Sequence, residues 1–368
     1  MASNEAILLN SEQRTANHNS ALVSIIIPAY NTAKYIHRAI ESSLRQTHHN
    51  VEVIVVDDGS SDETLSIARE YEMRDERVRV FTQGNAGVSA ARNHAMREAK
   101  GEYLTFLDSD DWLEDKAVEV LLDAQMKYPD MMPVARFLYV WYDEDTKKCW
   151  AANYEPFKQE ATLQSVSTEA LTTMGSLGTG GMSPKLFAAN KLKQHNIEFN
   201  MGVRYGEDTL FSFEYLCRMK GEVHINKFIY NYYHSSSVIH NPVARRVLGQ
   251  SDMEEQMLKV PGLSEDVKKL IKIRKTGSRI LNLSEGLAEG LNKDEIVLLR
   301  KSARKYMHEY LCASGNVKAK LLHKVLLCCL TLLPIPLARV IAKLYYRLWI
   351  RKMASLRHNI EAVEVSFR

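Results

Sequence analysis

The first hundred residues alternate between continuous apolar runs of strand length and segments with apolar residues at helical spacing. A run such as residues 23–29 (VSIIIPA) lacks polar alternation, which is typical of a strand covered on both faces. We expect strands at residues 23–29, 51–56, 78–81 and 103–107, and helices at 33–46, 60–73 and 88–99. This β-α-β-α-β-α-β order predicts an α/β fold with a mostly parallel sheet flanked by helices.

Two local patterns predict where helices begin. Ser60 and Glu63 have the spacing of a capping box, so we expect Ser60 to cap the second helix. Much later, Asp208 or Thr209 is expected to cap a helix that ends at Gly221. After Pro242 the remaining chain is predicted to be mainly helical.

Composition excludes several classes of protein. The 368 residues are 45% hydrophobic and 25% charged, with 9 Pro and 17 Gly, which excludes a disordered or collagen-like chain. The five cysteines are odd in number and include no C-x-x-C pair, so neither a disulfide framework nor a thiolate zinc site is indicated. The first twenty residues read as a polar leader rather than a signal peptide, which favours a cytoplasmic protein.

The positive charge is concentrated in the last part of the chain. From residue 315 onward there are ten Lys/Arg and two Asp/Glu, and no nucleic-acid-reading module is evident. Within residues 317–352, basic side chains recur every four residues among apolar ones, at Arg339, Lys343, Arg347 and Arg351. This pattern favours contact with the inner surface of a membrane, while the uncharged stretch 325–338 is shorter than the roughly 20 residues that span one. The alternative is a helical hairpin that packs on the enzyme's own core or forms a homodimer interface.

The turns at the carboxyl ends of the predicted strands hold the candidate chemistry. Ligands of open parallel sheets bind at this edge, so the turns at 28–31, 57–60 and 108–111 should converge there. No glycine follows the first strand, which disfavours a dinucleotide fingerprint and a P-loop. Asp108 and Asp110 are two residues apart, so on extended chain both carboxylates can face one Mg²⁺ or Mn²⁺ ion. The alternative is that this Asp-Ser-Asp motif only caps the next helix.

These residues resemble the family 2 glycosyltransferases of the GT-A fold, which use nucleotide sugars. The resemblance covers roughly residues 22–240 and rests on ordered blocks: VSIIIPAYN, VIVVDDGSSDET, NAGVSAARN, GEYLTFLDSDD and YGED. It implies that Asp110 is the principal metal ligand with Asp108 beside it, that Asp208 is the catalytic base, and that Glu207 is its neighbour near the acceptor. The nucleotide-binding residues implied by the resemblance are Pro28, Ala29, Tyr30, Asn31, Asp58, Arg92, Asp108 and Ser109. The alternatives without a catalytic or binding role are that Asp208 only caps a helix and that Arg92 lies on a solvated helix face.

The resemblance also implies a domain organisation. A GT-A domain would occupy residues 21–245, with a nucleotide-binding half over 21–127 and an acceptor half over 128–245. Residues 246–368 would form the helical C-terminal region. A Gly-rich stretch at 175–181 is expected to be a mobile loop beside the site.

The expected function is metal-dependent transfer of one sugar, with inversion, from a nucleotide-sugar donor to a glycan or lipid-linked acceptor. UDP is the expected nucleotide, and assembly of a surface polysaccharide is the expected setting. One alternative is a sugar nucleotidyltransferase, which would need a Gly-rich loop after the first strand. The other is a non-catalytic scaffold that keeps the fold at the membrane.

Overall fold

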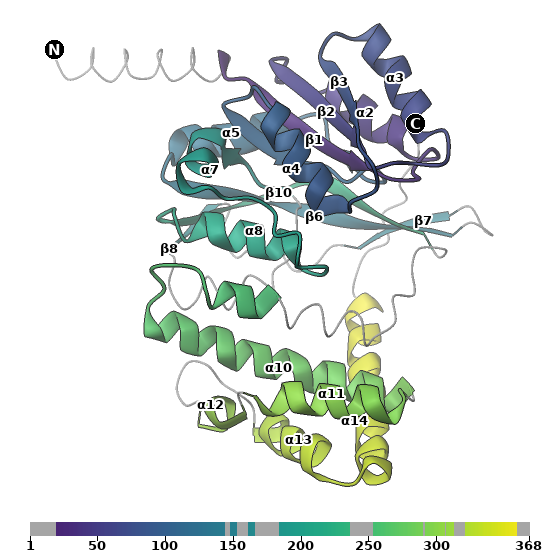
Figure 1. The fold of residues 1–368 in the computed structure, drawn as a ribbon, viewed down its shortest axis with the longest axis vertical. Helices are drawn as coiled ribbons and strands as arrows, with labels where there is room; N and C mark the ends of the chain where they lie inside the picture. Colours follow the sequence, from purple (N-terminus) through teal and green to yellow (C-terminus); the bar gives the residue numbers. More distant parts are fainter. Residues whose placement is uncertain are drawn as a thin grey trace, which may run out of the picture.

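A computed structural model gives the fold shown in Figure 1. It describes residues 20–143, 148–152, 161–165, 184–235, 253–289, 291–305, 307–312 and 321–358. Sheets with flanking helices form one part of the molecule, and a group of helices from the second half of the chain forms the other (Figure 1). The Gly-rich stretch 175–181 lies outside the described residues.

The first sheet confirms the predicted α/β unit. Its strand order is β3-β2-β1-β4-β9, and β1 to β4 run parallel while β9 runs antiparallel. The strands are β1 (Val23–Ala29), β2 (Val51–Asp57), β3 (Val78–Thr82), β4 (Tyr103–Phe106) and β9 (Phe187–Ala188). Every residue of β1 and β2 is buried, which explains why their sequences are continuous apolar runs rather than alternating ones.

Helices cover both faces of this sheet. They are α2 (Ile36–Leu44), α3 (Thr64–Arg74), α4 (Val88–Glu98) and α5 (Ala117–Lys127). Alternate residues of β1 point to opposite faces. Ile25 therefore belongs to the core that includes Ile36 and Ile40 of α2, whereas Ile26 belongs to the core that includes Ala91 and Ala95 of α4.

A second sheet extends from this unit. Its order is β5-β10-β6-β7, with β8 also paired to β10. The strands are β5 (Trp112–Leu113), β6 (Met131–Asp143), β7 (Lys148–Ala152), β8 (Ala161–Ser165) and β10 (Gly221–Ser235). The parallel β6–β10 pair joins segments about ninety residues apart, with Gly221 opposite Met131. Helices α7 (Ala189–His195) and α8 (Glu207–Leu216) lie between these strands in the sequence.

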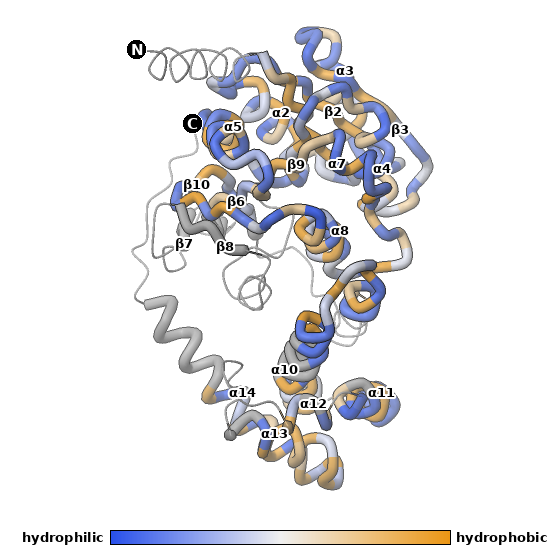
Figure 2. The backbone as a smooth tube through the Cα atoms, turned by 90° about the vertical axis from the view of Figure 1, so that its left-hand side faces the viewer, coloured by the Kyte–Doolittle hydropathy of each residue, from blue (hydrophilic) through white to orange (hydrophobic). Residues whose placement is uncertain are grey.

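The C-terminal helices have a core of their own. They are α10 (Glu265–Glu289), α11 (Lys293–Arg304), α12 (Met307–Leu311), α13 (Leu321–Leu332) and α14 (Ile335–His358). Leu283, Leu299, Leu327 and Ala338 from four of these helices share one buried cluster. Figure 2 shows apolar segments in the sheet region and again along α13. The expectation of a mainly helical region after the α/β domain is confirmed over the described residues.

Two predicted helix starts are wrong. Helix α3 begins at Thr64 without a side-chain cap, because the hydroxyl of Ser60 accepts a hydrogen bond from the Asn31 N–H instead (3.0 Å). Helix α8 begins at Glu207 after Gly206, which has a left-handed φ of 76°. Asp208 therefore lies inside the first turn of α8 and does not cap it. The helix ends at Leu216, and Gly221 opens β10.

Candidate active site

The turns after β1 and β2 are joined by hydrogen bonds. The Asp58 N–H donates to the Ala29 carbonyl (2.8 Å), and the Ser61 N–H donates to the side-chain oxygen of Asn31 (2.8 Å). Asn31 adopts a left-handed φ of 52°, a region that Asn tolerates better than most residues. The preceding Pro28 and Ala29 are buried at the end of β1, while the ring of Tyr30 is 49% exposed. The first two turns therefore form one edge, as expected from the sequence.

The two aspartates at the carboxyl end of β2, Asp57 and Asp58, have different surroundings. Asp58 is buried, and its carboxylate accepts hydrogen bonds from the Ala86 and Gly87 N–H groups (2.9 and 2.8 Å) and the Gln83 amide (2.8 Å). It thereby fixes the segment that enters α4. The Oδ2 atom of Asp57 accepts from the Ser60 N–H (3.2 Å), whereas its Oδ1 atom is buried and meets no donor within the described part of the chain. Asp57 lies in the predicted 57–60 turn but was not among the predicted nucleotide-binding residues.

The turn after β4 is held by a buried tyrosine and a buried carboxylate. The hydroxyl of Tyr230 donates to Asp111 (2.5 Å) and accepts from the Asp108 N–H (3.2 Å). Asp111 is fully buried and also accepts from the Tyr233 N–H (2.7 Å). These contacts fix the backbone that carries Asp108, Ser109 and Asp110. Asp111 therefore has a structural role that the motif alone did not show.

Arg38 of α2 supports the same turn from the other side. Its guanidinium donates to the Asp110 carbonyl (2.5 Å) and lies over the rings of Trp112 and Tyr233, 4.1 and 4.7 Å from their centroids. Stacking on two aromatic faces suits the planar guanidinium. Arg38 thus positions the Asp108–Asp111 turn. No motif in the sequence indicated this role of Arg38.

Asp110 is half-buried next to other acids. Burial, and then repulsion from Asp108, raises the pKa of Asp110 to about 6, against a smaller opposing effect of Arg38. A divalent cation at this carboxylate would offset both penalties, so the donor set fits Mg²⁺ or Mn²⁺. Within the described ranges, no three His, Cys, Asp or Glu side chains are grouped as a protein-only metal site. A cation here would complete its coordination with water and ligand phosphates, as Mg²⁺ usually does.

Arg92 connects the turn after β4 with the start of α8. It lies on α4 and is 3% exposed, which excludes the solvated helix face considered as an alternative. Its guanidinium contacts Asp108 (2.8 Å) and Glu207 (3.1 Å). Burial lowers the pKa of Arg92, but Asp108, Glu207 and Asp208 outweigh this effect and raise it overall. One buried cation therefore gathers acids from two distant parts of the chain.

Glu207 and Asp208 occupy the first turn of α8, where the helix dipole favours negative charge. Burial and repulsion from Asp208 raise the pKa of Glu207, and Arg92 opposes this. The Oδ1 atom of Asp208 accepts from the Thr209 N–H (2.5 Å). Asp208 is half-buried and therefore accessible to a ligand. The fold thus brings the predicted acids Asp108, Glu207 and Asp208 around Arg92.

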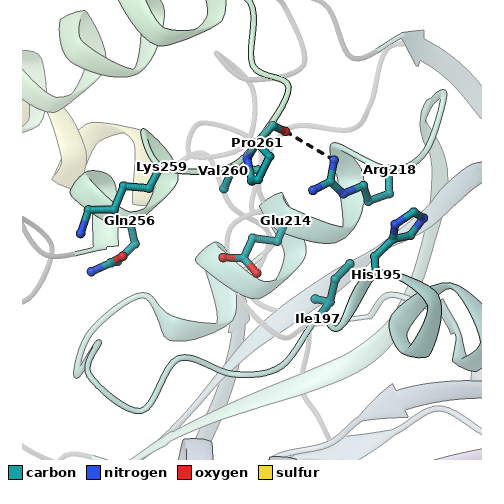
Figure 3. Close-up of a pocket in the computed structure, with 8 residues that line it drawn as sticks. All are labelled: His195, Ile197, Glu214, Arg218, Gln256, Lys259, Val260 and Pro261. Atoms are coloured by element: carbon teal, nitrogen blue, oxygen red, sulfur yellow. Dashed lines mark hydrogen bonds between the residues drawn. The ribbon is translucent and has the colours of Figure 1, made fainter.

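A separate cavity lies at the other end of α8 (Figure 3). It has a volume of about 220 Å³ and is lined by His195, Ile197, Glu214, Arg218, Gln256, Lys259, Val260 and Pro261. Arg218 extends to the Pro261 carbonyl at its edge (3.4 Å). None of the predicted site residues lines it, so this cavity is distinct from the cluster around Arg92.

We expect the change Arg92→Met to lower the free energy of unfolding by about 3–5 kcal/mol, because it leaves the carboxylates of Asp108 and Glu207 without their buried partner. Urea unfolding followed by circular dichroism measures this. The exposed Arg97 on the same helix provides the matched control, and Arg97→Met should stay within about 0.5 kcal/mol of wild type. Equal stability of the two variants would contradict the bridging role.

Comparisons with known proteins identify the family. Residues 24–216 match the family described as Glycosyl transferase family 2. Glycosyltransferase GlyA of Streptococcus pneumoniae serotype 4 is 30% identical over 217 residues, which are 57% of this chain and 30% of that protein. Chondroitin synthase of Escherichia coli is 52% identical over 102 residues, which are 28% of this chain and 15% of that protein. The match thus spans less than a third of the length of either relative.

A solved structure shows the same fold. The S. aureus TarS 1-349 complex with UDP-GlcNAc has a TM-score of 0.65 and 18% identity, and the alignment covers 89% of this chain and 92% of that one. This likeness confirms the predicted GT-A fold with a helical C-terminal region. The family match covers more than half of the chain, and the chain is therefore a member of glycosyl transferase family 2.

Proposed function

We propose that this glycosyltransferase transfers one sugar from a UDP-sugar to a glycan or lipid-linked acceptor, with inversion, during synthesis of a surface polysaccharide. The observation that carries the proposal is the contact of Arg92 with both Asp108 and Glu207. Arg92 thereby joins the turn after β4 to the start of α8, and we assign the first to the donor and the second to the acceptor. Relatives named as polysaccharide synthases and a TarS complex with UDP-GlcNAc support the choice of donor and setting.

In the proposed reaction Asp208 acts as the general base. The acceptor hydroxyl is a weak nucleophile, and a carboxylate that accepts its proton strengthens it in the transition state. The acceptor oxygen bonds to the anomeric carbon as the bond from that carbon to the UDP oxygen breaks, so UDP leaves with the bonding electron pair. A single displacement inverts the anomeric centre. Glu207 lies beside Asp208, where it can orient the acceptor.

The nucleotide would bind along the edge formed by the turns after β1, β2 and β4. The half-exposed ring of Tyr30 offers a surface for the base, and Pro28 to Asn31 border it. The carboxylate of Asp58 already accepts three hydrogen bonds, whereas Asp57 Oδ1 accepts none from the described residues. A carboxylate offers about four acceptor positions, so Asp58 can still accept one more hydrogen bond, and we assign Asp58 to the N–H edge of the base, whereas Asp57 is only 1% exposed.

We also propose that Asp110, with Asp108 near it, holds Mg²⁺ or Mn²⁺ together with the donor diphosphate. Such a cation would stabilise negative charge on the leaving phosphate as a Lewis acid. The raised pKa of Asp110 supports this assignment, because Arg38 only partly offsets burial and the repulsion from Asp108. Ser109 is buried in the same turn and would lie near the ribose and the sugar.

Calorimetric titration of UDP, GDP, ADP and CMP, with and without Mn²⁺, tests the donor site. We expect UDP to bind in a metal-dependent way and the other nucleotides to bind more weakly. Absence of binding by any nucleotide would overturn the donor assignment and favour the scaffold alternative. Tight metal-dependent binding of another nucleotide would agree with a glycosyltransferase, but its donor would then carry that nucleotide instead of UDP.

The C-terminal helices support a further part of the proposal, which is contact with the inner surface of a membrane. No helix in the described ranges combines the length and apolarity needed to cross a bilayer. One face of α14 packs on the enzyme's own helices, where Ala338 and Ala342 are fully buried. The opposite face carries an exposed apolar row, whose members are 50–64% exposed: Leu337, Val340, Leu344 and Leu348.

An anionic bilayer fits this exposed row better than a second copy of the chain. Lys343 and Arg347 are exposed beside the row, and the chain from residue 315 onward is strongly basic. Pairing two copies through the row would bring these positive charges together, whereas anionic lipid would neutralise them. The homodimer alternative thus becomes an outcome of the test below. This contact would place the enzyme at the cytoplasmic face, where a lipid-linked acceptor is accessible.

Vesicle sedimentation tests the membrane contact. We expect the protein to bind vesicles that contain phosphatidylglycerol, and the double change Leu344→Ser with Leu348→Ser to weaken binding at least tenfold, since each buried leucine contributes about 1.5–3 kcal/mol. The exposed pair Val297 and Leu298 on α11 is the matched control, and its serine variant should bind like wild type. Equal binding of the two double variants, or dimerisation without vesicle binding, would overturn this contact.

A further inference from the structure

Gln83 lies directly after β3, at the start of the loop that leads to α4, and both ends of its side-chain amide are held. The amide nitrogen donates to Asp58 Oδ1 (2.8 Å), and the amide oxygen lies 2.9 Å from His94 Nδ1. A carboxylate only accepts hydrogen bonds, so the nitrogen of Gln83 must face Asp58 and its oxygen must accept from His94. The ring of His94 packs in turn against Phe81, with 5.5 Å between the ring centroids. These contacts fix the direction of the Gln83 amide.

The backbone around Gln83 is fixed to the turn that carries Asp58. The Gln83 N–H donates to the Asp57 carbonyl (3.0 Å). Gly59 has a left-handed φ of 75°, and a Cβ at this position would lie 2.9 Å from the Asn85 nitrogen and 3.3 Å from the Gln83 carbonyl oxygen. Only glycine therefore allows this approach of the two segments. Gln83 and Asp58 are thus held side by side by the backbone as well as by their own hydrogen bond.

Each of these two side chains can make one more hydrogen bond. The amide nitrogen of Gln83 carries two N–H groups, and within the described part of the chain only Asp58 accepts from it. The Oδ1 atom of Asp58 accepts from Gln83 and from the Ala86 N–H, whereas Oδ2 accepts only from the Gly87 N–H. The pair therefore presents one donor, on Gln83, next to one acceptor, on Asp58.

A donor next to an acceptor distinguishes between nucleotide bases. Uracil, like thymine, has a carbonyl acceptor beside its N–H, whereas cytosine has an amino donor at the same place and no hydrogen on the neighbouring ring nitrogen. The Gln83–Asp58 pair matches the edge of uracil. With cytosine, a donor would face a donor and an acceptor would face an acceptor.

We propose that Gln83 is a specificity-determining residue, whose second N–H donates to the base carbonyl beside the N–H that Asp58 accepts. This inference rests on the nucleotide site proposed above and names the class of base that the site takes. A site built around hydrogen bonds rejects an analogue that lacks the matching groups, because its own polar groups are then left unpaired. Gln83 thus excludes donors that carry cytosine.

Calorimetric titration of UDP and CDP at fixed Mn²⁺ tests this inference through the ratio of the two affinities. We expect Gln83→Met, which keeps an unbranched side chain but has no side-chain N–H, to weaken UDP binding about tenfold and to leave CDP binding unchanged. The preference for UDP then falls by the same factor. Gln194→Met is the matched control, because Gln194 is exposed on α7, and this variant should bind both nucleotides like wild type.

A second variant separates recognition of the base from support of the loop. Gln83→Lys loses the amide that bonds to His94 but restores N–H donors beside Asp58, so it should keep the preference for UDP. Equal weakening of UDP and CDP in Gln83→Met, an unchanged ratio in that variant, or loss of the preference in Gln83→Lys would overturn the inference.

The same titrations separate the role of Gln83 from the proposed function. A wild-type protein that binds UDP and CDP equally would overturn the role of Gln83 and leave the donor site in place. A wild type that binds neither nucleotide would overturn the donor site and the role of Gln83 together.

Discussion

The change Asp208→Asn is expected to lower kcat for sugar transfer by about 10²–10⁴-fold, the usual contribution of a general base. Asparagine has the same shape, and its side-chain oxygen can still accept the hydrogen bond from the Thr209 N–H. It cannot accept the proton of the acceptor hydroxyl. The loss should therefore fall on kcat, while metal-dependent donor binding in calorimetry stays at the wild-type level.

Glu214 provides a matched control for this variant. It lies on the same helix, is also partly buried, and lines the separate cavity at the other end of α8. Glu214→Gln should keep kcat within a few-fold of wild type. If Asp208→Asn kept the wild-type rate, or if both variants lost activity equally, the assignment of the base to Asp208 would be wrong.

The second large effect is expected for Asp110→Asn, which should weaken Mn²⁺-dependent UDP binding by about 100-fold or more. Even residues that only orient metal ligands change affinity by 10–100-fold, and Asp110 is the proposed ligand itself. Calorimetric titration of UDP at fixed Mn²⁺ measures this. Asp115→Asn is the control. Asp115 lies two residues before α5, is exposed, and among the ion pairs of the described residues contacts only Arg45, at 3.5 Å.

The Mn²⁺-dependent affinity for UDP should also depend on pH, and the direction of the change follows from the pKa of Asp110. Asp110 has a pKa of about 6, so it is ionised above this pH and protonated below it. Protons then compete with the cation, and UDP affinity in Mn²⁺ should fall as the pH is lowered through about 6. Asp110→Asn should show a weaker dependence, because only the terminal phosphate of UDP, with a second pKa of about 6, then titrates in this range. Wild-type UDP binding that ignores both Mn²⁺ and pH would contradict the proposed metal site.

Local patterns in the sequence were sufficient for the four parallel strands of the first sheet, whereas the antiparallel β9 was not predicted. The continuous apolar runs of β1 and β2 indicated strands buried on both faces, and the helical spacing between them indicated parallel crossovers. Because parallel strands end at one edge, the sequence alone places the turns with Asn31, Asp58 and Asp108 at a common site. The apolar content of the last hundred residues likewise indicated helices.

Predictions that depended on a single side chain were less successful. Ser60 has capping-box spacing, but its hydroxyl bonds to the Asn31 N–H, because the turns after β1 and β2 are adjacent in space. Asp is a residue type that favours N-caps, but the left-handed Gly206 takes the N-cap position, two residues before Asp208. In both cases a neighbouring backbone group decided between two conformations that the local sequence allows equally.

The sequence by itself determined the order of the strands and helices and the set of acids at the sheet edge, since both follow from short-range hydrophobic periodicity. Only the tertiary structure decided which charges are paired. Arg92 and Glu207 are 115 residues apart in the chain, yet their side chains are in contact. The physical reason is that a charged residue, considered alone in the sequence, is expected on the solvated surface. Its burial becomes favourable only when folding places oppositely charged groups from distant segments around it.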